Sequence, residues 1–169
     1  GNVYRFLENI VNFYKSKGVD VCVVRTSSIY GPYDNFNPKK SHVIPALIKK
    51  IFDTKKNEIK IWGNPNVVRD FVYVDDLAKA IVLLMNKKVT EPINFSYGKG
   101  LTIISLAKIL IKLSGKKIKF KFINPKLSSA PYRVLENKLF NRIFKKFKRT
   151  GIEDGLKKTI NWYLNDRKK

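Results

Sequence analysis

The sequence predicts an α/β fold with a doubly wound parallel sheet, and three observations predict it. An amphipathic helical segment precedes a nearly continuous β-branched run at 19–24, which has the length and composition of a strand buried on both faces. Helix-like and strand-like segments then alternate to the end of the chain. Hydrophobic residues make up 44% of the 169 residues, enough for a sizeable core. We therefore expect 1–169 to form one compact body.

Hydrophobic periodicity places the elements in order. A helix is expected at 3–16, because apolar residues recur at helical spacing until Gly18 ends the pattern. After the strand at 19–24 and a long polar loop, a second helix is expected at 42–52 with Ser41 as its N-cap. The remaining expected elements are strand 59–62, strand 71–74, a helix capped by Asp75 and running through 77–85, strand 91–97, helix 102–113, edge strand 117–123 and a last helix that starts behind Glu153 and Asp154.

Charge is the most unusual bulk property of the chain. Lys and Arg number 35 against 13 Asp and Glu, a net charge of +22, and the segment 99–149 holds 15 basic residues and one acidic residue. Such a field attracts nucleic acid, anionic membranes or anionic small molecules. The segment lacks zinc-finger, RNA-recognition and helix-turn-helix signatures. Solvated lysines on helix faces are therefore the simpler interpretation, and nucleic acid is not the expected partner.

Other features narrow the class of protein. No apolar run reaches the roughly 18–20 residues that a membrane-spanning helix needs, so no membrane partner is expected. Cys22 is the single cysteine and cannot form an internal disulfide, which favours a cytoplasmic location. We expect no metal site.

The segment 25–45 gives the strongest indication of a ligand site. It leaves the predicted strand, turns at 30–32, crosses a polar loop and brings His42, the only histidine, to the start of a helix. Strand ends that open into polar loops are where α/β proteins build ligand sites. The positive end of the helix disfavours imidazolium, so a proton held by His42 is easier to donate. His42 is therefore a candidate proton carrier.

Two strings carry a resemblance to a known family. They are Gly-Pro-Tyr-Asp-Asn-Phe-Asn followed by Ser-His-Val-Ile-Pro-Ala-Leu within 31–47, and Trp-Gly-x-x-x-x-x-Arg-Asp-Phe-Val-Tyr-Val-Asp-Asp at 62–76. The chain resembles the extended short-chain dehydrogenase/reductases of the NAD-dependent epimerase/dehydratase family, and within it the GDP-L-fucose synthases. The resemblance implies the C-terminal part of a Rossmann-like sheet, at about 1–34 and 67–90. A small α/β substrate-binding part would occupy about 35–66 and 91–169, and the dinucleotide-binding half would be missing.

The resemblance also implies a cofactor site for NADP or NAD. The expected cofactor contacts are His42 and the segment Thr26, Ser27, Ser28 and Ile29. Small hydroxyl residues let a flat nicotinamide ring approach the backbone and can hydrogen-bond its carboxamide. The family pattern has Pro and Asn at positions 26 and 28, where this chain has Thr and Ser.

A nucleotide-sugar site is implied as well. The expected contacts are Lys50, Trp62, Arg69 and Ser128, with Arg133 as a further candidate phosphate ligand. The physical chemistry fits, because an indole can lie against a base or sugar ring and a guanidinium can clamp a phosphate with paired hydrogen bonds. The family often has an acidic residue where this chain has Ser128. In the intact enzyme, His42 would shuttle protons at the carbons flanking a 4-keto group.

The chain also departs from the family pattern. These enzymes use a tyrosine four residues ahead of a lysine, and alignment puts the tyrosine before Gly1 and Tyr4 at the lysine position. No glycine-rich phosphate loop occurs in the sequence. We therefore expect an inactive fragment of an enzyme that epimerises GDP-4-keto-6-deoxymannose at carbons 3 and 5 and reduces it with NADPH. A homodimer through the helix from Val3 is also expected.

Three alternatives stay open at this point. The intact enzyme could be a UDP-sugar 4-epimerase or a dehydratase. The chain could instead be a binding module that uses the basic stretch 99–149 on nucleic acid or an anionic surface. Or it could be a remnant that pairs with a separately encoded Rossmann half.

Overall fold

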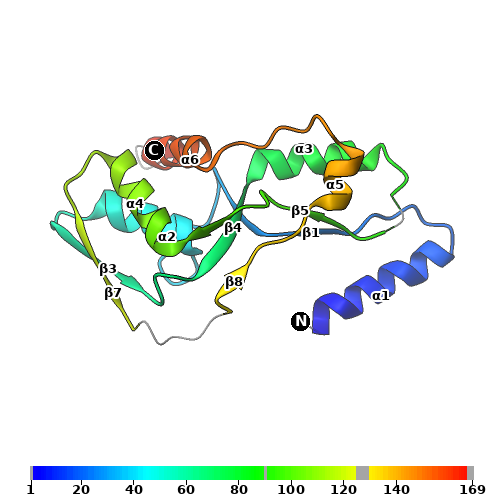
Figure 1. Ribbon diagram of the computed structural model, residues 1–169, viewed down its shortest axis with the longest axis horizontal. Coiled ribbons are helices and arrows are strands. Elements are labelled where there is room, and N and C mark those ends of the chain that lie inside the picture. The colour runs from blue at the N-terminus through cyan, green and yellow to red at the C-terminus, as the bar shows by residue number, and fades with distance from the viewer. Residues whose placement is uncertain (1, 90, 125–129, 167–169) are drawn as a thin grey trace.

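The computed structural model describes residues 2–89, 91–124 and 130–166, and Figure 1 shows how its elements are arranged. Helices and pairs of successive strands follow one another along most of the chain. In sequence order the elements are α1 (Asn2–Ser16), β1 (Val24–Thr26), β2 (Ser28–Tyr30), α2 (Val43–Asp53), β3 (Glu58–Trp62), β4 (Val68–Tyr73), α3 (Val74–Met85), β5 (Ile93–Phe95), β6 (Gly100–Thr102), α4 (Ile103–Ser114), β7 (Lys119–Ile123), β8 (Tyr132–Arg133), α5 (Lys138–Ile143) and α6 (Ile152–Asp166). This is the predicted α/β class with parallel strand pairs.

One end of the molecule is built on the parallel pair β1 and β5, in which Val24 lies opposite Ile93 and Thr26 opposite Phe95. Helices α3 and α5 pack with this pair around a buried apolar cluster that includes Val72, Phe95 and Phe140. The guanidinium of Arg149 lies over three phenylalanine rings of this cluster, and its Nε donates to the carbonyl of Ser96 at 2.7 Å.

The other end holds a second, larger apolar cluster. Helices α2, α4 and α6 pack around strands β3 and β4, with side chains such as Ile48, Leu106 and Ile160 at the centre. β3 pairs with β7 in parallel, while β4 pairs with β2, β6 and β8. Strand β4 runs between the two ends in Figure 1. The candidate site lies beside β4, where the chain continues from β2 into the following loop.

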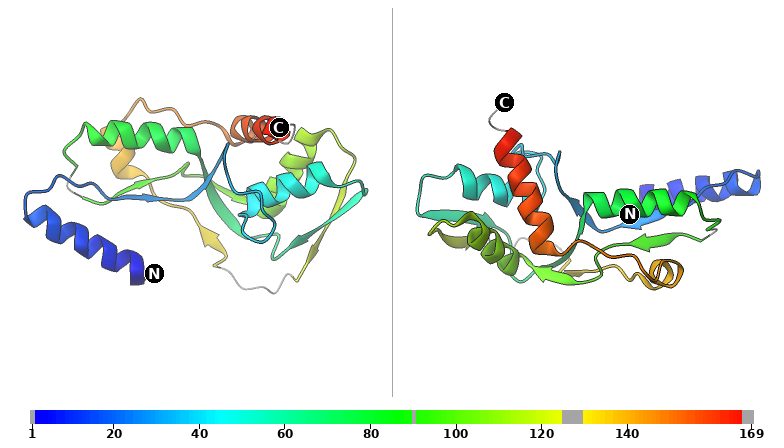
Figure 2. Two further views of the ribbon diagram at one scale, coloured as in Figure 1. Left: turned by 180° about the vertical axis from the view of Figure 1, so that it is seen from behind. Right: turned by 90° about the horizontal axis from the view of Figure 1, so that it is seen from above.

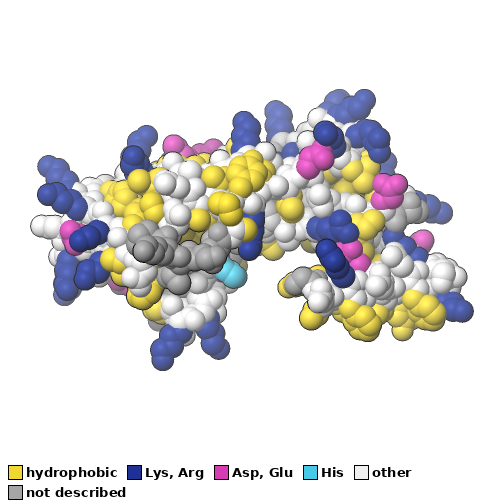
Figure 3. Space-filling view, turned by 60° about the horizontal axis from the view of Figure 1, so that its bottom comes forward, with side chains coloured by type: hydrophobic (Ala, Val, Ile, Leu, Met, Phe, Trp, Pro, Cys, Tyr) yellow, Lys and Arg dark blue, Asp and Glu magenta, His cyan; other side chains and the backbone are white. Residues whose placement is uncertain are grey.

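Helix α1 lies apart from both clusters (Figures 1 and 2) and has no buried residue. It is tied to β1 by a two-pronged ion pair in which Arg25 donates to Glu8 at 2.8 and 2.6 Å. Its large apolar side chains are exposed, Tyr4 at 75% and Phe6 at 64% among them. Figure 3 shows apolar side chains lining the outer edge of this helix. The helix therefore carries an apolar stripe that the described residues do not cover.

Several local expectations were wrong. The strand expected at 19–24 begins only at Val24, and Val19 is 46% exposed rather than buried. In the described part of the chain β5 is the only strand paired with β1, and its hydrogen bonding reaches back only to Val23, whose carbonyl accepts the N–H of Ile93 at 2.8 Å. The short elements β2, β6, β8 and α5 were not predicted.

The expected helix caps were wrong as well. His42, not Ser41, is the N-cap of α2, and Tyr73, not Asp75, is the N-cap of α3 because β4 runs directly into that helix. The neighbouring Asp76 is buried and accepts hydrogen bonds from the N–H and hydroxyl of Thr150.

None of the helices in the described ranges combines the length and hydropathy that crossing a bilayer requires.

Candidate functional site

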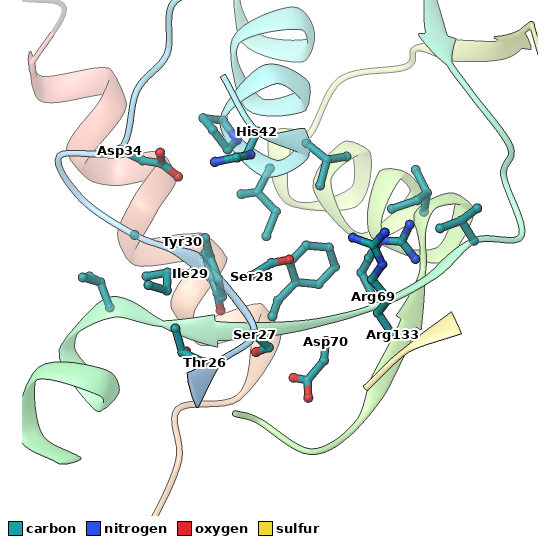
Figure 4. A pocket seen from close by; sticks show the side chains of 18 of the residues that line it. Thr26, Ser27, Ser28, Ile29, Tyr30, Asp34, His42, Arg69, Asp70 and Arg133 are labelled. Atoms are coloured by element: carbon teal, nitrogen blue, oxygen red, sulfur yellow. The ribbon is translucent and has the colours of Figure 1, made fainter. Parts of the chain in front are cut away.

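A cavity of about 1200 Å³ opens where β2, β4 and β8 meet the start of α2. Its wall includes His42, Trp62 and Arg69, which come from a loop, from β3 and from β4. The whole segment 26–29, expected beside a nicotinamide, lines the same cavity. The structure thus brings together residues from both family-like strings, as Figure 4 shows for those it labels.

The loop 31–42 is stiffened by successive side-chain-to-backbone bonds. The N–H of Asn35 donates to Asp34 Oδ1 at 2.7 Å, that of Asn37 to Asn35 Oδ1 at 2.9 Å, and that of Lys39 to Asn37 Oδ1 at 3.0 Å. Asn and Asp favour such turns because their short side chains reach the backbone two residues on. The polar composition of the loop therefore fixes its path without any ligand.

Aromatic rings anchor the same loop to the last helix. Phe36 stacks on Trp162 and Tyr163 of α6, with ring centroids 5.8 and 4.5 Å apart, and Tyr33 lies 5.0 Å from Trp162. Tyr33 adopts a φ of 66°, which a residue other than glycine holds only where its surroundings enforce it. The hydroxyl of Tyr163 donates to Asp53 on α2 at 2.8 Å. These contacts tie the loop, α6 and α2 into one unit.

His42 stands at the junction of this loop and α2. Its carbonyl accepts the N–H of Ala46 at 3.0 Å, which fixes its backbone at the first helical turn. Its side chain forms no capping bond, so the imidazole is not used to hold the helix. The side chain is exposed at the rim of the cavity, and Figure 3 shows the chain's one histidine at the molecular surface. The ring can therefore meet a ligand in the cavity.

Two guanidinium groups lie together on another wall. Arg69 on β4 is opposite Arg133 on β8 in the sheet register, and Figure 4 shows their side chains beside each other. Arg69 donates through one NH group to the carbonyls of Val68 and Ala130, at 2.7 and 2.9 Å. Burial lowers the pKa of Arg69, and the neighbouring charge of Arg133 lowers it further. Two like charges held this close form an attractive site for a doubly charged anion such as a diphosphate.

The floor beside the arginines is held by Asp70. Its side chain is 1% exposed, and its two oxygens accept the N–H groups of Tyr97 and Gly98, each at 3.1 Å. Both oxygens have partners, so Asp70 fixes the turn between β5 and β6 and is not expected to bind a ligand. Sequence analysis did not single it out, although it follows Arg69 directly in the family-like string.

Tyr30 also lines the cavity but is a poor proton carrier. Burial, together with the charge of Asp76, raises the pKa of its phenol far above neutral pH. Its hydroxyl donates to the carbonyl of Ile152 at 3.5 Å. The phenol therefore stays protonated and packs against α6.

Of the other expected substrate contacts, Trp62 lies in the cavity wall and Lys50 does not. Trp62 is 63% exposed at the cavity rim, open to a flat ring. Lys50 is not among the described cavity residues, and its ammonium donates to the carbonyl of Lys60 at 2.7 Å. Ser128 lies outside the described residues.

Part of the basic segment 99–149 has a structural role. The ammonium of Lys116 donates to the carbonyls of Ile51 and Phe52 at 2.9 and 2.8 Å, where α2 ends. Arg149 lies among the aromatic rings described above. On the face shown in Figure 3 the basic side chains are spread over the whole outline. These two residues are therefore engaged within the protein itself.

Comparison with known proteins identifies the family. Residues 5–97 match the NAD dependent epimerase/dehydratase family. The chain belongs to this family. It is 31% identical to a probable GDP-L-fucose synthase 1 of Oryza sativa subsp. japonica over 88% of its own length, and 34% identical to a GDP-L-colitose synthase of Yersinia pseudotuberculosis over 83%.

The solved structures agree on the fold. The crystal structure of a GDP-L-fucose synthetase from Naegleria fowleri, also solved bound to NADP, superposes with a TM-score of 0.89 over 97% of this chain at 24% identity. This chain covers 54% of that protein, and 46% and 47% of the rice and Yersinia relatives. It thus spans about half the length of the family members it matches, with the Rossmann-like α/β fold of the epimerases and reductases.

Proposed function

We propose that the full-length protein is a nucleotide-sugar epimerase and reductase of the GDP-L-fucose synthase type. It would epimerise GDP-4-keto-6-deoxymannose at carbons 3 and 5 and then reduce the ketone with NADPH. One observation carries this proposal: the imidazole of His42 shares a single cavity with a pair of guanidinium groups. Relatives at 31% and 34% identity that are named GDP-L-fucose synthase and GDP-L-colitose synthase support the same reading.

The substrate would be held by its charge and its rings. Arg69 and Arg133 would bind the diphosphate, since both line the cavity and each guanidinium carries several N–H donors. Trp62 would lie against the base or a sugar ring. In Figure 4 His42 and the arginine pair lie on different sides of the cavity, so the hexose would lie between them.

His42 would then move protons at the sugar. A carbon next to a ketone loses its proton readily, and an imidazole at the cavity rim can remove a proton from, or deliver one to, the face of the sugar that it meets, while inversion needs a second proton carrier on the opposite face. The ring suits this role because it is exposed and forms no bond that holds α2. His42 would thus serve as acid and base at the carbons that flank the 4-keto group.

The segment 26–29 fits the nicotinamide end of NADP or NAD. It lines the cavity with small hydroxyl side chains, and the Oγ of Ser27 is buried without a hydrogen-bond partner among the described residues. Such an unfilled polar atom can hydrogen-bond a carboxamide. When bound, the dinucleotide supplies the hydride for reduction of the ketone. The residues of this chain would only hold the ring and keep it against the sugar.

Calorimetry with the purified chain tests substrate binding. We expect GDP-mannose to bind, Arg69→Ala to weaken it by about tenfold or more, and UDP-glucose to bind more weakly. Arg142→Ala is the matched control, because Arg142 is exposed on α5 and does not line the cavity. Affinity for GDP-mannose that survives Arg69→Ala would overturn the site, and a preference for UDP-glucose would favour a UDP-sugar 4-epimerase.

We further propose that this chain alone does not catalyse hydride transfer. Tyr4 stands where the family has a lysine, and a phenol cannot supply that positive charge. The purified chain with NADPH and a GDP-4-keto sugar should therefore show no change in absorbance at the wavelength of the reduced nicotinamide. Measurable oxidation of NADPH would refute this.

The exposed stripe of α1 is our candidate for a homodimer interface. Tyr4, Phe6 and Phe13 are each more than half exposed on this helix. Sedimentation should show a dimer for the chain and a monomer for the Phe6→Glu variant. A monomer in both cases would remove the proposal.

A further inference from the structure

Three buried side-chain oxygens lack a hydrogen-bond partner in the described part of the chain, and all three lie close together in sequence. They are Ser27 Oγ, Asp34 Oδ2 and Ser41 Oγ. Buried polar atoms normally have partners, so each such atom calls for an explanation. The three lie in or beside the loop that carries His42.

Asp34 differs from the other carboxylate in the cavity wall. Of the described residues that line the cavity, Asp34 and Asp70 alone are acidic. Asp70 uses both oxygens on backbone N–H groups. Asp34 uses Oδ1 on the N–H of Asn35, and its Oδ2 is buried with no donor. Asp34 therefore has one carboxylate oxygen that can accept a further hydrogen bond.

The imidazole of His42 is the matching group. It lies on the same loop and lines the same cavity, and it forms no hydrogen bond or ion pair with any of the described residues. A neutral imidazole carries one N–H donor and one acceptor nitrogen. Figure 4 shows the carboxylate of Asp34 turned toward the side of the cavity where His42 lies. An unfilled donor and an unfilled buried acceptor thus face one region.

We propose that Asp34 is a positioning residue that accepts a hydrogen bond from the imidazole of His42 and fixes which ring nitrogen faces the cavity. The contact would require rotation of the ring about its side-chain bonds, because the loop backbone is already held by its own turns. The hydrogen bond of one ring nitrogen decides which tautomer is present. This inference rests on the proposed role of His42 and names the group that would set its reactive nitrogen.

The surrounding charges make such a partner useful. Arg69 and Arg133 face the cavity from β4 and β8, Lys39 and Lys40 precede His42 in the loop, and the N-terminus of α2 adds partial positive charge. Asp34 is the one described acidic residue of the cavity wall with an oxygen left to counter them.

Nitrogen-15 NMR of the full chain tests the proposal directly, because His42 is its only histidine. At about pH 8.5, where a neutral imidazole exists as two tautomers, long-range proton–nitrogen spectra show which nitrogen carries the proton. We expect one tautomer to dominate in the native chain. Asp34→Asn should change the tautomer ratio by about tenfold, toward that of free histidine. The asparagine oxygen can still accept the N–H of Asn35, so the loop should keep its path.

Ser41→Ala is the control, because Ser41 carries the rival unfilled hydroxyl. It should leave the tautomer ratio unchanged. A native chain with the tautomer mixture of free histidine would overturn the proposal without any variant, and so would a Ser41→Ala change as large as that of Asp34→Asn. Calorimetry with GDP-mannose is a separate readout: absence of binding removes the proposed function, whereas the tautomer spectra judge Asp34 alone.

Discussion

The substitution Asp70→Asn tests how the floor of the cavity is held. Asp70 is almost completely buried on β4, and its two oxygens accept the backbone N–H groups of Tyr97 and Gly98 at 3.1 Å each. Asparagine has the same shape but only one acceptor oxygen. One backbone N–H would therefore lose its partner and face the NH₂ group of the new side chain.

The size of the effect follows from these two bonds. A buried donor without a partner costs about 1–3 kcal/mol, and the remaining bond loses charge assistance worth roughly 1 kcal/mol. The free energy of unfolding should therefore fall by about 2–4 kcal/mol. For a domain of this length that lowers the melting temperature by roughly 5–15 °C.

Urea unfolding followed by circular dichroism measures the change. Asp20→Asn is the matched control, because it removes the same charge from an exposed side chain and should alter the free energy of unfolding by less than about 0.5 kcal/mol. Equal urea midpoints for the two variants would show that the bonds to Tyr97 and Gly98 do not hold the floor in place.

Three further predictions concern packing, a thiol and an ion pair. A Cβ at Gly155 would overlap the hydroxyl of Tyr30 and come within 2.9 Å of its Cζ, so Gly155→Ala should lower the free energy of unfolding by about 1–3 kcal/mol. Adding Tyr30→Phe should restore part of this loss, because the hydroxyl overlap is removed and the Cζ contact remains; no rescue would contradict the packing argument. Burial raises the pKa of the Cys22 thiol, so at pH near 8 this thiol should react with a disulfide reagent several-fold more slowly than free cysteine. The reaction rate should increase with pH, and a rate equal to that of free cysteine would refute the prediction. The hydrogen bond from Arg25 lowers the pKa of Glu8, so the ion pair that holds α1 to β1 is complete above the ordinary value of 4.5 and is lost as the pH falls through the lowered value. Amide hydrogen exchange in α1 should then accelerate, as it should for Arg25→Ala at neutral pH. Unchanged exchange would count against a role of this ion pair in holding α1.

Helices with long apolar patterns were predictable from the sequence. The pattern at 102–113 alone sets an apolar stripe, and Thr102 caps the resulting helix α4 by accepting the N–H of Ser105 at 3.2 Å. The helix at 3–16 was equally clear, although it has no buried residue. Local periodicity therefore fixes these elements whether or not their tertiary partners are present.

Features that depend on distant partners were not predictable. The sequence shows two adjacent aspartates, Asp75 and Asp76, and gives no reason to bury the second. That choice depends on Thr150, which lies 74 residues further on. The strand at 19–24 likewise depends on a neighbour, and the pairing with β5 begins only at Val24.

The candidate site was predictable to the extent that family-like strings specify it. The strings around His42 and Arg69 lead to one cavity, because the loop and β4 meet at β2. Arg133 was only a further candidate, since its value comes from its place opposite Arg69 in the β4–β8 register. Asp34 stood out only once the burial of its second oxygen was visible.

The contacts of Tyr33 and Phe36 with α6 bear on where this protein can be shortened or fused. No described residue of α6 lines the cavity, yet the rings of Trp162 and Tyr163 brace the loop that delivers the imidazole. A clone that stops before residue 152, or a bulky tag pressed against the final helix, would therefore be expected to displace His42, which lies more than a hundred positions earlier. Helix α6, near the carboxyl-terminal end of this chain, thus braces the loop that carries His42.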